Sequence, residues 1–226
     1  MAELIARILI TIHRLVDANR MVHQWFISIV NRSVGEQRVA AALRALIRRD
    51  DVTWDVGANV GVYTRLGLEI AGTSGHVVAV DPVSFNTARL RELGPAERLT
   101  VVEAALSSSD GVMPLVISGK DGETSSLGEG PGAVPVRVAR GDTLLGEGVP
   151  RPQVIKVDVE GFEGDVLEGM PDALSSVRDV LVEVHFAAMA RQGRPSEPLR
   201  VLRLLRASGL SVRWIDPSHI VATRVP

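Results

Sequence analysis

Short apolar runs alternate with helical patterns along most of the chain after residue 51. Seven runs have the length of a strand; they lie at residues 52–56, 77–80, 99–102, 154–157, 180–184, 210–215 and 220–225. Strands joined by crossover helices pair in parallel, with right-handed connections. The alternation therefore predicts an α/β domain with a mostly parallel, seven-stranded sheet. Only a short turn separates the last two runs, which predicts an antiparallel C-terminal hairpin.

The first 49 residues are expected to form an N-terminal helical extension, or cap, before a domain that spans residues 50–226. Apolar residues recur at helical spacing from residue 3 to residue 30, and a second amphipathic pattern covers residues 36–49. Two interpretations of the first segment stay open. It can pack on the domain or on a second copy of the chain, as in a homodimer. Alternatively, it can make a peripheral membrane contact, with Trp25 and Phe26 at the lipid surface.

Composition and charge exclude several kinds of site. The chain has no cysteine, so disulfides, thiolate metal sites and cysteine nucleophiles are excluded. A formal charge of -2 gives no general attraction to nucleic acid, and no nucleic-acid partner is expected. The N-terminus has no signal-peptide pattern, and no apolar run approaches the roughly 20 residues that span a bilayer. We therefore expect a cytoplasmic protein.

One long segment interrupts the alternation. Residues 118–133 are rich in glycine, serine and proline, and they separate apolar runs near residues 113–117 and 134–138. This composition predicts a long mobile loop. Long loops inside compact domains are more often functional than accidental. The segment is interpreted as a lid or acceptor-binding loop, with a simple surface excursion as the alternative.

A glycine turn follows the first apolar run. Its spacing is D-x-G-x-N-x-G and includes Asp55, Gly57, Asn59 and Gly61. The glycines allow a tight turn and the close approach of a backbone or ligand, and the helix that follows directs its free N–H groups toward the turn. A dinucleotide site would have G-x-G-x-x-G and would hold a pyrophosphate. Because an acidic residue in the turn suits a cationic, amino-acid-like ligand better, the turn points to S-adenosylmethionine.

Acidic residues recur where the predicted strands end. They are Asp55, Asp81, Glu103, Asp158 and Glu183. In an open α/β sheet these ends face one crevice, where ligands bind. A carboxylate at the second strand end suits the two hydroxyls of a ribose, so Asp81 is assigned to that group. Glu103 and its neighbour Ala104 lie where the adenine of the same ligand would rest.

Two motifs carry a resemblance to a known family. The glycine turn looks like motif I of class I S-adenosylmethionine-dependent methyltransferases. Residues 155–163 resemble the I-K-x-D-V-E-G-x-E signature of the FkbM family within that class. The resemblance covers roughly residues 50–225 and implies a Rossmann-like fold and O-methylation of a hydroxylated small molecule or saccharide.

The family's roles are transferred by position. Asp55, Gly57, Asn59 and Gly61 would frame the methionine part of the cofactor, while Asp158 would border the same pocket. The family often has Glu-Pro at the second strand end; the pair here is Asp81-Pro82. The chain also has Gly141-Asp142 where Leu-Asp is usual, so no role is transferred to Asp142.

Transfer of a methyl group to a hydroxyl requires removal of the hydroxyl proton as the new bond forms. The candidate bases are His185, Asp158 and Glu183, of which His185 has the most suitable ordinary pKa, about 6.5. In an alternative assignment of roles, Asp158 and Glu183 bind Mg²⁺, as residues at the same strand ends do in catechol O-methyltransferase-like enzymes. The alternative function is a non-catalytic S-adenosylmethionine-binding or interaction module with the same fold.

Overall fold

The computed structural model describes residues 1–17, 32–118, 124–128 and 130–225. Seven strands form the main sheet, in the order β10-β11-β9-β8-β1-β2-β3. Their bounds are β1 Val52–Val56, β2 His76–Asp81, β3 Leu99–Glu103, β8 Val154–Val157, β9 Asp179–Glu183, β10 Leu210–Trp214 and β11 His219–Arg224. Strand β11 runs antiparallel to both β9 and β10, and the other pairings are parallel. The predicted seven-stranded sheet with an antiparallel C-terminal hairpin is confirmed.

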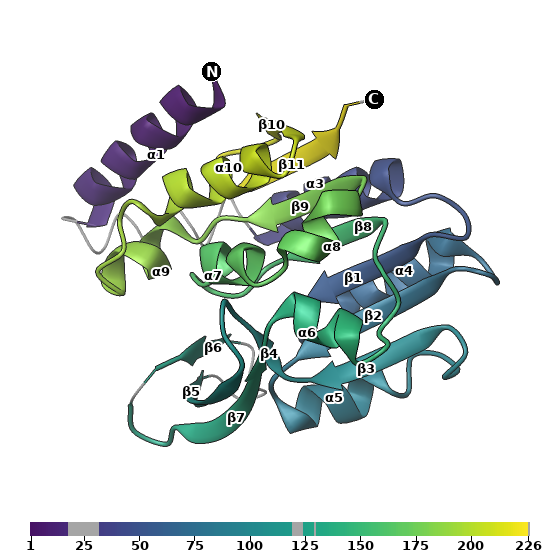
Figure 1. Ribbon diagram of the computed structural model, residues 1–226. Helices are drawn as coiled ribbons and strands as arrows, with labels where there is room; N and C mark the ends of the chain where they lie inside the picture. Colours follow the sequence, from purple (N-terminus) through teal and green to yellow (C-terminus); the bar gives the residue numbers. More distant parts are fainter. Residues whose placement is uncertain (18–31, 119–123, 129, 226) are drawn as a thin grey trace.

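Helices cover both faces of this sheet (Figure 1). Helices α3 (Arg32–Leu46), α4 (Val62–Ala71) and α5 (Ser84–Leu90) pack on one face, where Leu43, Leu66 and Leu90 are buried. Helices α6 (Gly141–Gly146), α7 (Glu163–Glu168), α8 (Pro171–Ser176) and α10 (Glu197–Ala207) pack on the other. Because both faces are covered, the central strands are mostly apolar and do not alternate regularly between apolar and polar residues.

Several helices were not predicted from the sequence. Helices α6, α8 and α9 (Phe186–Arg191) have six residues each, too few to show a helical repeat. The Gly141-Asp142 pair has a structural role in this region. The carboxylate of Asp142 accepts hydrogen bonds from the backbone N–H groups of Asp172 (3.1 Å) and Ala173 (3.1 Å), at the start of α8. These bonds satisfy donors that have no partner within the helix.

A second, four-stranded sheet lies beside the C-terminal ends of β1, β2 and β3 (Figure 1). Its order is β4-β7-β5-β6, with β4 Ala105–Leu106, β5 Gly111–Ser118, β6 Thr124–Leu127 and β7 Val134–Ala139. The segment interpreted as a loop therefore contains a strand, β6, which pairs antiparallel with β5. Its Thr-Ser-Ser-Leu sequence lacks an apolar alternation because β6 is an edge strand of a small sheet, held by backbone pairing. Residues 119–123 and 129 of that segment lie outside the described residues.

Helix α1 (Ala2–Asp17) packs against α10, α9 and β10. Ala2 and Ala6 are buried there, and the indole N–H of Trp214 donates a hydrogen bond to the Ala2 carbonyl at 3.0 Å. The opposite side of α1 exposes Leu4, Ile8 and Ile12, at 62%, 49% and 47%. This apolar ridge is what the homodimer and membrane interpretations require, and both stay predictions. Residues 18–31, including Trp25 and Phe26, lie outside the described residues.

No helix in the described part of the chain is both long enough and apolar enough to cross a membrane.

Candidate active site

The site lies where β1 and β8 lie side by side and the chain connections diverge to opposite sides of the sheet. Ligands bind at such switch points, outside the carboxyl ends of the strands. Gly57 follows β1 with a φ of 76°, and a Cβ there would lie 1.8 Å from the carbonyl oxygen of Asp158. A glycine is therefore required, because the chain after β8 passes directly against the turn.

The turn is tied to the end of β2. The N–H groups of Gly57 and Ala58 both donate to the carbonyl of Val80, at 2.9 and 3.1 Å. The N–H of Asn59 donates to Asp81 Oδ2 at 2.9 Å. Gly61 has a φ of 86°, and a Cβ there would lie 2.3 Å from the side chain of Leu93. Gly61 thus serves the packing of the turn.

The carboxylate of Asp81 is buried and already hydrogen bonded. Besides Asn59, it accepts from the N–H of Val83 at 2.9 Å and from the side-chain amide of Asn86 at 3.1 Å. Burial raises the pKa of Asp81, and these hydrogen bonds only partly oppose that rise. An ionised carboxylate has about four acceptor positions. Three donors therefore leave Asp81 able to accept one more hydrogen bond.

A cavity opens above the turn. Its walls come from both sheets: Val56, Gly57, Asn59, Val80, Asp81, Pro82, Ala104, Ala105, Leu106, Leu115, Leu127, Asp158, Val159, Glu160 and Phe162. Five predicted cofactor-binding residues border it, namely Gly57, Asn59, Asp81, Ala104 and Asp158. Leu115 of β5 and Leu127 of β6 close one side, so the small sheet forms a wall of the cavity.

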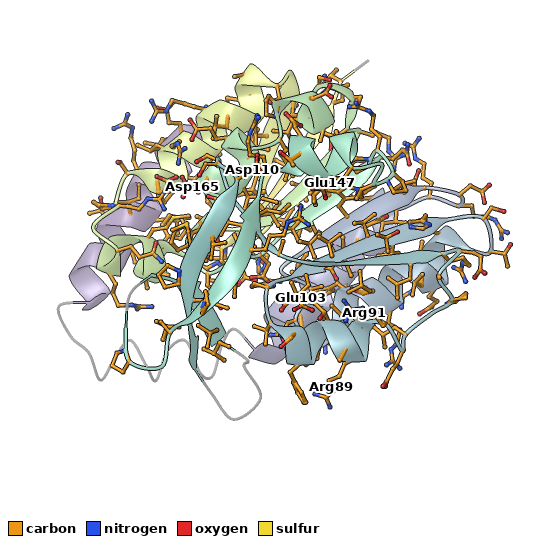
Figure 2. All side chains as sticks on the ribbon, turned by 60° about the horizontal axis from the view of Figure 1, so that its bottom comes forward. Arg89, Arg91, Glu103, Asp110, Glu147 and Asp165 are labelled. Atoms are coloured by element: carbon orange, nitrogen blue, oxygen red, sulfur yellow. The ribbon has the colours of Figure 1, made fainter. Side chains whose placement is uncertain are left out.

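The remaining predicted cofactor-binding residues do not border this cavity. Asp55 is 2% exposed and accepts a hydrogen bond from Thr64 Oγ1 at 2.6 Å, beneath the turn. The carboxylate of Glu103 is directed toward α5, where it accepts from Thr87 Oγ1 at 2.6 Å and lies 3.6 Å from Arg91 (Figure 2). A position at a strand end did not show which carboxylates border the cavity, because the direction of each side chain depends on its packing partners.

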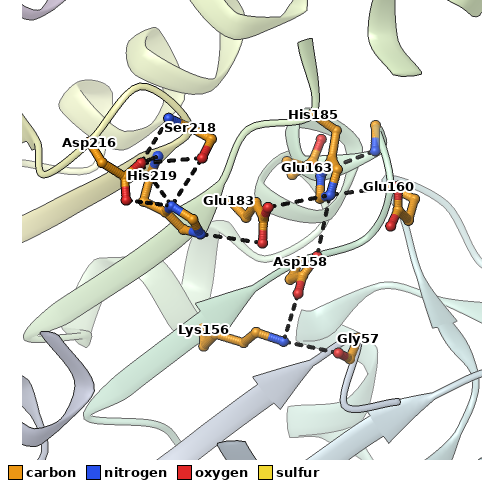
Figure 3. A network of polar contacts seen from close by, with 11 residues as sticks. Gly57, Lys156, Asp158, Glu160, Glu163, Glu183, His185, Asp216, Ser218 and His219 are labelled. Atoms are coloured by element: carbon orange, nitrogen blue, oxygen red, sulfur yellow. Dashed lines mark hydrogen bonds and ion pairs between the residues drawn. The ribbon is translucent and has the colours of Figure 1, made fainter. Parts of the chain in front are cut away.

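Lys156, the lysine of the I-K-x-D signature, is buried and connects the glycine turn after β1 with Asp158 after β8 (Figure 3). Its ammonium group lies 3.2 Å from Asp55 and 3.3 Å from Asp158, and it donates to the carbonyl of Gly57 at 3.0 Å. Burial lowers the pKa of Lys156, but the two carboxylates outweigh burial and raise the pKa above its ordinary value. The lysine therefore stays charged. Its role was missed because the signature alone does not show what the lysine contacts.

The three predicted catalytic residues lie together. Asp158, Glu183 and His185 each offer one possible metal-ligand atom, and these three atoms lie within 4.8 Å of one another. His185 Nε2 is 3.6 Å from Asp158, 3.6 Å from Glu160 and 3.8 Å from Glu183. A single ring nitrogen thus faces three carboxylates (Figure 3).

The other ring nitrogen of His185 is held by Glu163. His185 Nδ1 lies 2.6 Å from Glu163 Oε1, which also accepts from the N–H of Gly161 at 3.1 Å. Burial lowers the pKa of His185, but Glu163 and the facing carboxylates outweigh burial and raise the pKa well above its ordinary value. This setting favours the protonated imidazolium form of His185, so the ordinary pKa of a histidine does not apply here.

His219 adds a second imidazole behind Glu183. Burial lowers its pKa, but Asp216 and Glu183 outweigh burial and raise the pKa of His219 to about 9. No role was predicted for Asp216 and His219 from the sequence, because both stand in an ordinary turn sequence. Only the pairing of β11 with β9 brings His219 to Glu183.

The sheet order, the glycine turn after β1 and the buried carboxylate at the end of β2 define a Rossmann-like class I methyltransferase. Solved structures share the fold. FkbM methyltransferase from Methylobacillus flagellatus KT superposes with a TM-score of 0.54 at 18% identity, over 79% of this chain but only 45% of the other. A putative rRNA methylase from Clostridium thermocellum superposes with a TM-score of 0.54 at 10% identity, over 88% of this chain and 98% of the other.

Sequence similarity identifies the family. Residues 55–211 match the methyltransferase FkbM domain. The chain is also 36% identical to hexuronic acid methyltransferase AglP of Haloferax volcanii over 180 aligned residues. The aligned segment covers 78% of this chain and 70% of AglP. The chain therefore belongs to the FkbM methyltransferase family, as its signature at residues 155–163 indicated.

Proposed function

We propose that this methyltransferase transfers a methyl group from S-adenosylmethionine to a hydroxyl group of a sugar or of a sugar-containing metabolite or glycolipid. One observation carries the proposal. A single cavity is bordered on one side by Asn59 and Asp81, and on the other by Asp158, which belongs to the carboxylate and imidazole cluster. Cofactor binding and proton removal can therefore take place in one cavity.

The residues of the cavity fit the cofactor. Asp81 has an acceptor position left for a ribose hydroxyl, and Ala104, Leu106 and Leu115 form an apolar wall suited to a flat adenine ring. Gly57 and Asn59 would border the methionine part. Asp55 would act from below, through Lys156, rather than by contact. When bound, the cofactor supplies an electrophilic methyl group on a sulfonium.

The acceptor class rests on the relative's name. AglP is called a hexuronic acid methyltransferase, and a hexuronic acid offers several hydroxyls and one carboxylate. The carboxylates around His185 Nε2 outnumber its single positive charge. An anionic acceptor would be repelled by this excess charge unless a cation also entered the site.

We further propose a divalent cation held by Asp158, Glu183 and His185. His185 donates from Nδ1 to a carboxylate and presents Nε2 to the cluster, as metal-ligating histidines do. Carboxylates suit Mg²⁺ and Mn²⁺, while imidazole suits zinc and iron. A bound cation would lower the pKa of the acceptor hydroxyl. The three side chains then position the hydroxyl, and a carboxylate of the cluster accepts its proton.

In the metal-free state the neighbouring carboxylates raise the pKa of His185 well above its ordinary value, which favours the protonated ring and disfavours His185 as the base. Asp158 is a poor base as well. Burial raises its pKa, but Lys156 and His185 outweigh burial and hold the pKa below its usual range. Of the three bases predicted from the sequence, Glu183 is then the one left to accept the hydroxyl proton.

Calorimetry with S-adenosylmethionine, followed by methyl transfer to a panel of glycans with and without hexuronic acids, tests the proposal. Transfer should require Asp158 and should fall strongly in Asp158→Asn, whereas Asp110→Asn, a surface carboxylate between β4 and β5, should behave as wild type. Activity that is lost with EDTA and restored by Mg²⁺, Mn²⁺ or Zn²⁺ supports the cation. Undiminished activity in EDTA would remove the cation and leave Glu183 as the base. Cofactor binding without transfer to any hydroxyl would contradict the proposed reaction.

A further inference from the structure

The C-terminal hairpin contributes a residue to the site from outside the segment that matches the family. The match ends at residue 211, whereas His219 opens β11 and is the register partner of Glu183 on β9. His219 Nε2 lies 3.3 Å from Glu183 Oε2 (Figure 3). Glu183 therefore stands between two imidazoles, because its other oxygen faces His185 at 3.8 Å.

His219 is itself held firmly by the turn that precedes it. Its Nδ1 lies 2.8 and 2.9 Å from the two oxygens of Asp216. Asp216 Oδ1 also accepts the backbone N–H groups of Ser218 and His219, both at 2.8 Å. His219 is buried, with 5% of the residue exposed. This anchoring fixes the ring orientation and directs Nε2 toward Glu183.

We propose that Asp216 and His219 are positioning residues that hold the Glu183 carboxylate toward Asp158 and His185. The inference rests on the proposed function, in which Glu183 contacts a cation or the acceptor. The Glu183 side chain is one-third exposed, so without His219 it could rotate toward solvent. A glutamate has considerable rotamer freedom to lose on becoming fixed. A preorganised partner behind it offsets that loss.

The test compares turnover in His219→Leu with turnover in His76→Leu. His76 also uses both ring nitrogens, 2.8 Å from Thr100 Oγ1 and 3.2 Å from the Glu97 carbonyl, but at the opposite end of the sheet. We expect kcat to fall roughly 10- to 100-fold in His219→Leu, with the dissociation constant for S-adenosylmethionine unchanged. His76→Leu should keep wild-type kcat. His219→Gln, which retains a donor, should recover part of the loss.

A double variant shows whether His219 acts through Glu183. In a Glu183→Gln background, His219→Leu should cause little further loss of kcat, because the carboxylate it positions is already absent. Multiplicative losses would show that His219 acts independently, and would overturn the inference. So would an unchanged kcat in a folded His219→Leu protein.

Crystal structures of the wild type and of His219→Leu keep the inference separate from the proposed function. The Glu183 carboxylate should leave its single wild-type position in the variant, whether or not the chosen acceptors are methylated. If wild type binds no S-adenosylmethionine, the proposed function fails on its own. If Glu183 keeps its position in His219→Leu, the positioning role fails on its own.

Discussion

Replacement of Lys156 by methionine should be among the most damaging single substitutions in this protein. The ammonium group is 4% exposed and lies within 3.3 Å of the carboxylates of Asp55 and Asp158. Methionine fills a similar volume, so the change removes the charge and leaves little cavity. It would leave Asp55, which is 2% exposed, as a buried carboxylate without its cation.

The expected loss of unfolding free energy is about 3–5 kcal/mol, the cost of removing one partner from a buried ion pair. Urea titrations followed by far-UV circular dichroism would measure it as a lower midpoint with an unchanged slope. Arg44→Met provides the matched control. Arg44 pairs with Glu69 at 3.3 Å, but both side chains are more than half exposed, so its loss should be under about 1 kcal/mol.

A double variant examines the cause of the loss. Asp55→Asn combined with Lys156→Met removes both buried charges, and it should be more stable than Lys156→Met alone, because the uncompensated carboxylate is the source of the cost. A loss below about 1 kcal/mol in Lys156→Met would refute the reasoning. A double variant less stable than Lys156→Met would refute it as well.

The other predictions concern the pH dependence and the ligands. The pKa of His219 is about 9 in the folded protein and about 6.5 when unfolded. The protonated ring should contribute on the order of 3 kcal/mol to the unfolding free energy. This contribution should be fully present below the unfolded pKa and should disappear as the pH rises through the folded pKa. The unfolding free energies of metal-free wild type and His219→Gln, measured by urea titration across that range, should therefore converge at high pH. Asp81→Asn should weaken S-adenosylmethionine binding roughly 10- to 100-fold in calorimetry, whereas Glu103→Gln, whose carboxylate does not border the cavity, should bind nearly as wild type. His185→Ala should lower kcat roughly 100-fold, because the acceptor would no longer be positioned, and should leave cofactor affinity within a factor of about two. An equal loss in both quantities would indicate collapse of the pocket.

Much of the fold followed from local pattern. The central strands are mostly apolar because they are buried on both faces, and this is why the sequence could predict a mostly parallel, seven-stranded sheet. The short helices α6, α8 and α9 could not be predicted, because six residues are fewer than two helical turns. The edge strand β6 could not be predicted either, because its Thr-Ser-Ser-Leu sequence has no apolar alternation. Backbone pairing with β5, rather than side-chain pattern, makes residues 124–127 a strand.

The sequence by itself determined the class of site: a glycine turn, carboxylates at strand ends and a signature that names the family. It did so because each feature depends on local spacing. Only the tertiary structure decided what each carboxylate does, because that depends on what lies opposite it. Asp81 borders the cavity while Glu103 turns to Arg91. The charge of His185 is likewise set by Glu163 on α7 and by the carboxylates that follow β8. The placement of His219 is set by the pairing of β11 with β9, two strands that are distant in sequence and adjacent in the sheet.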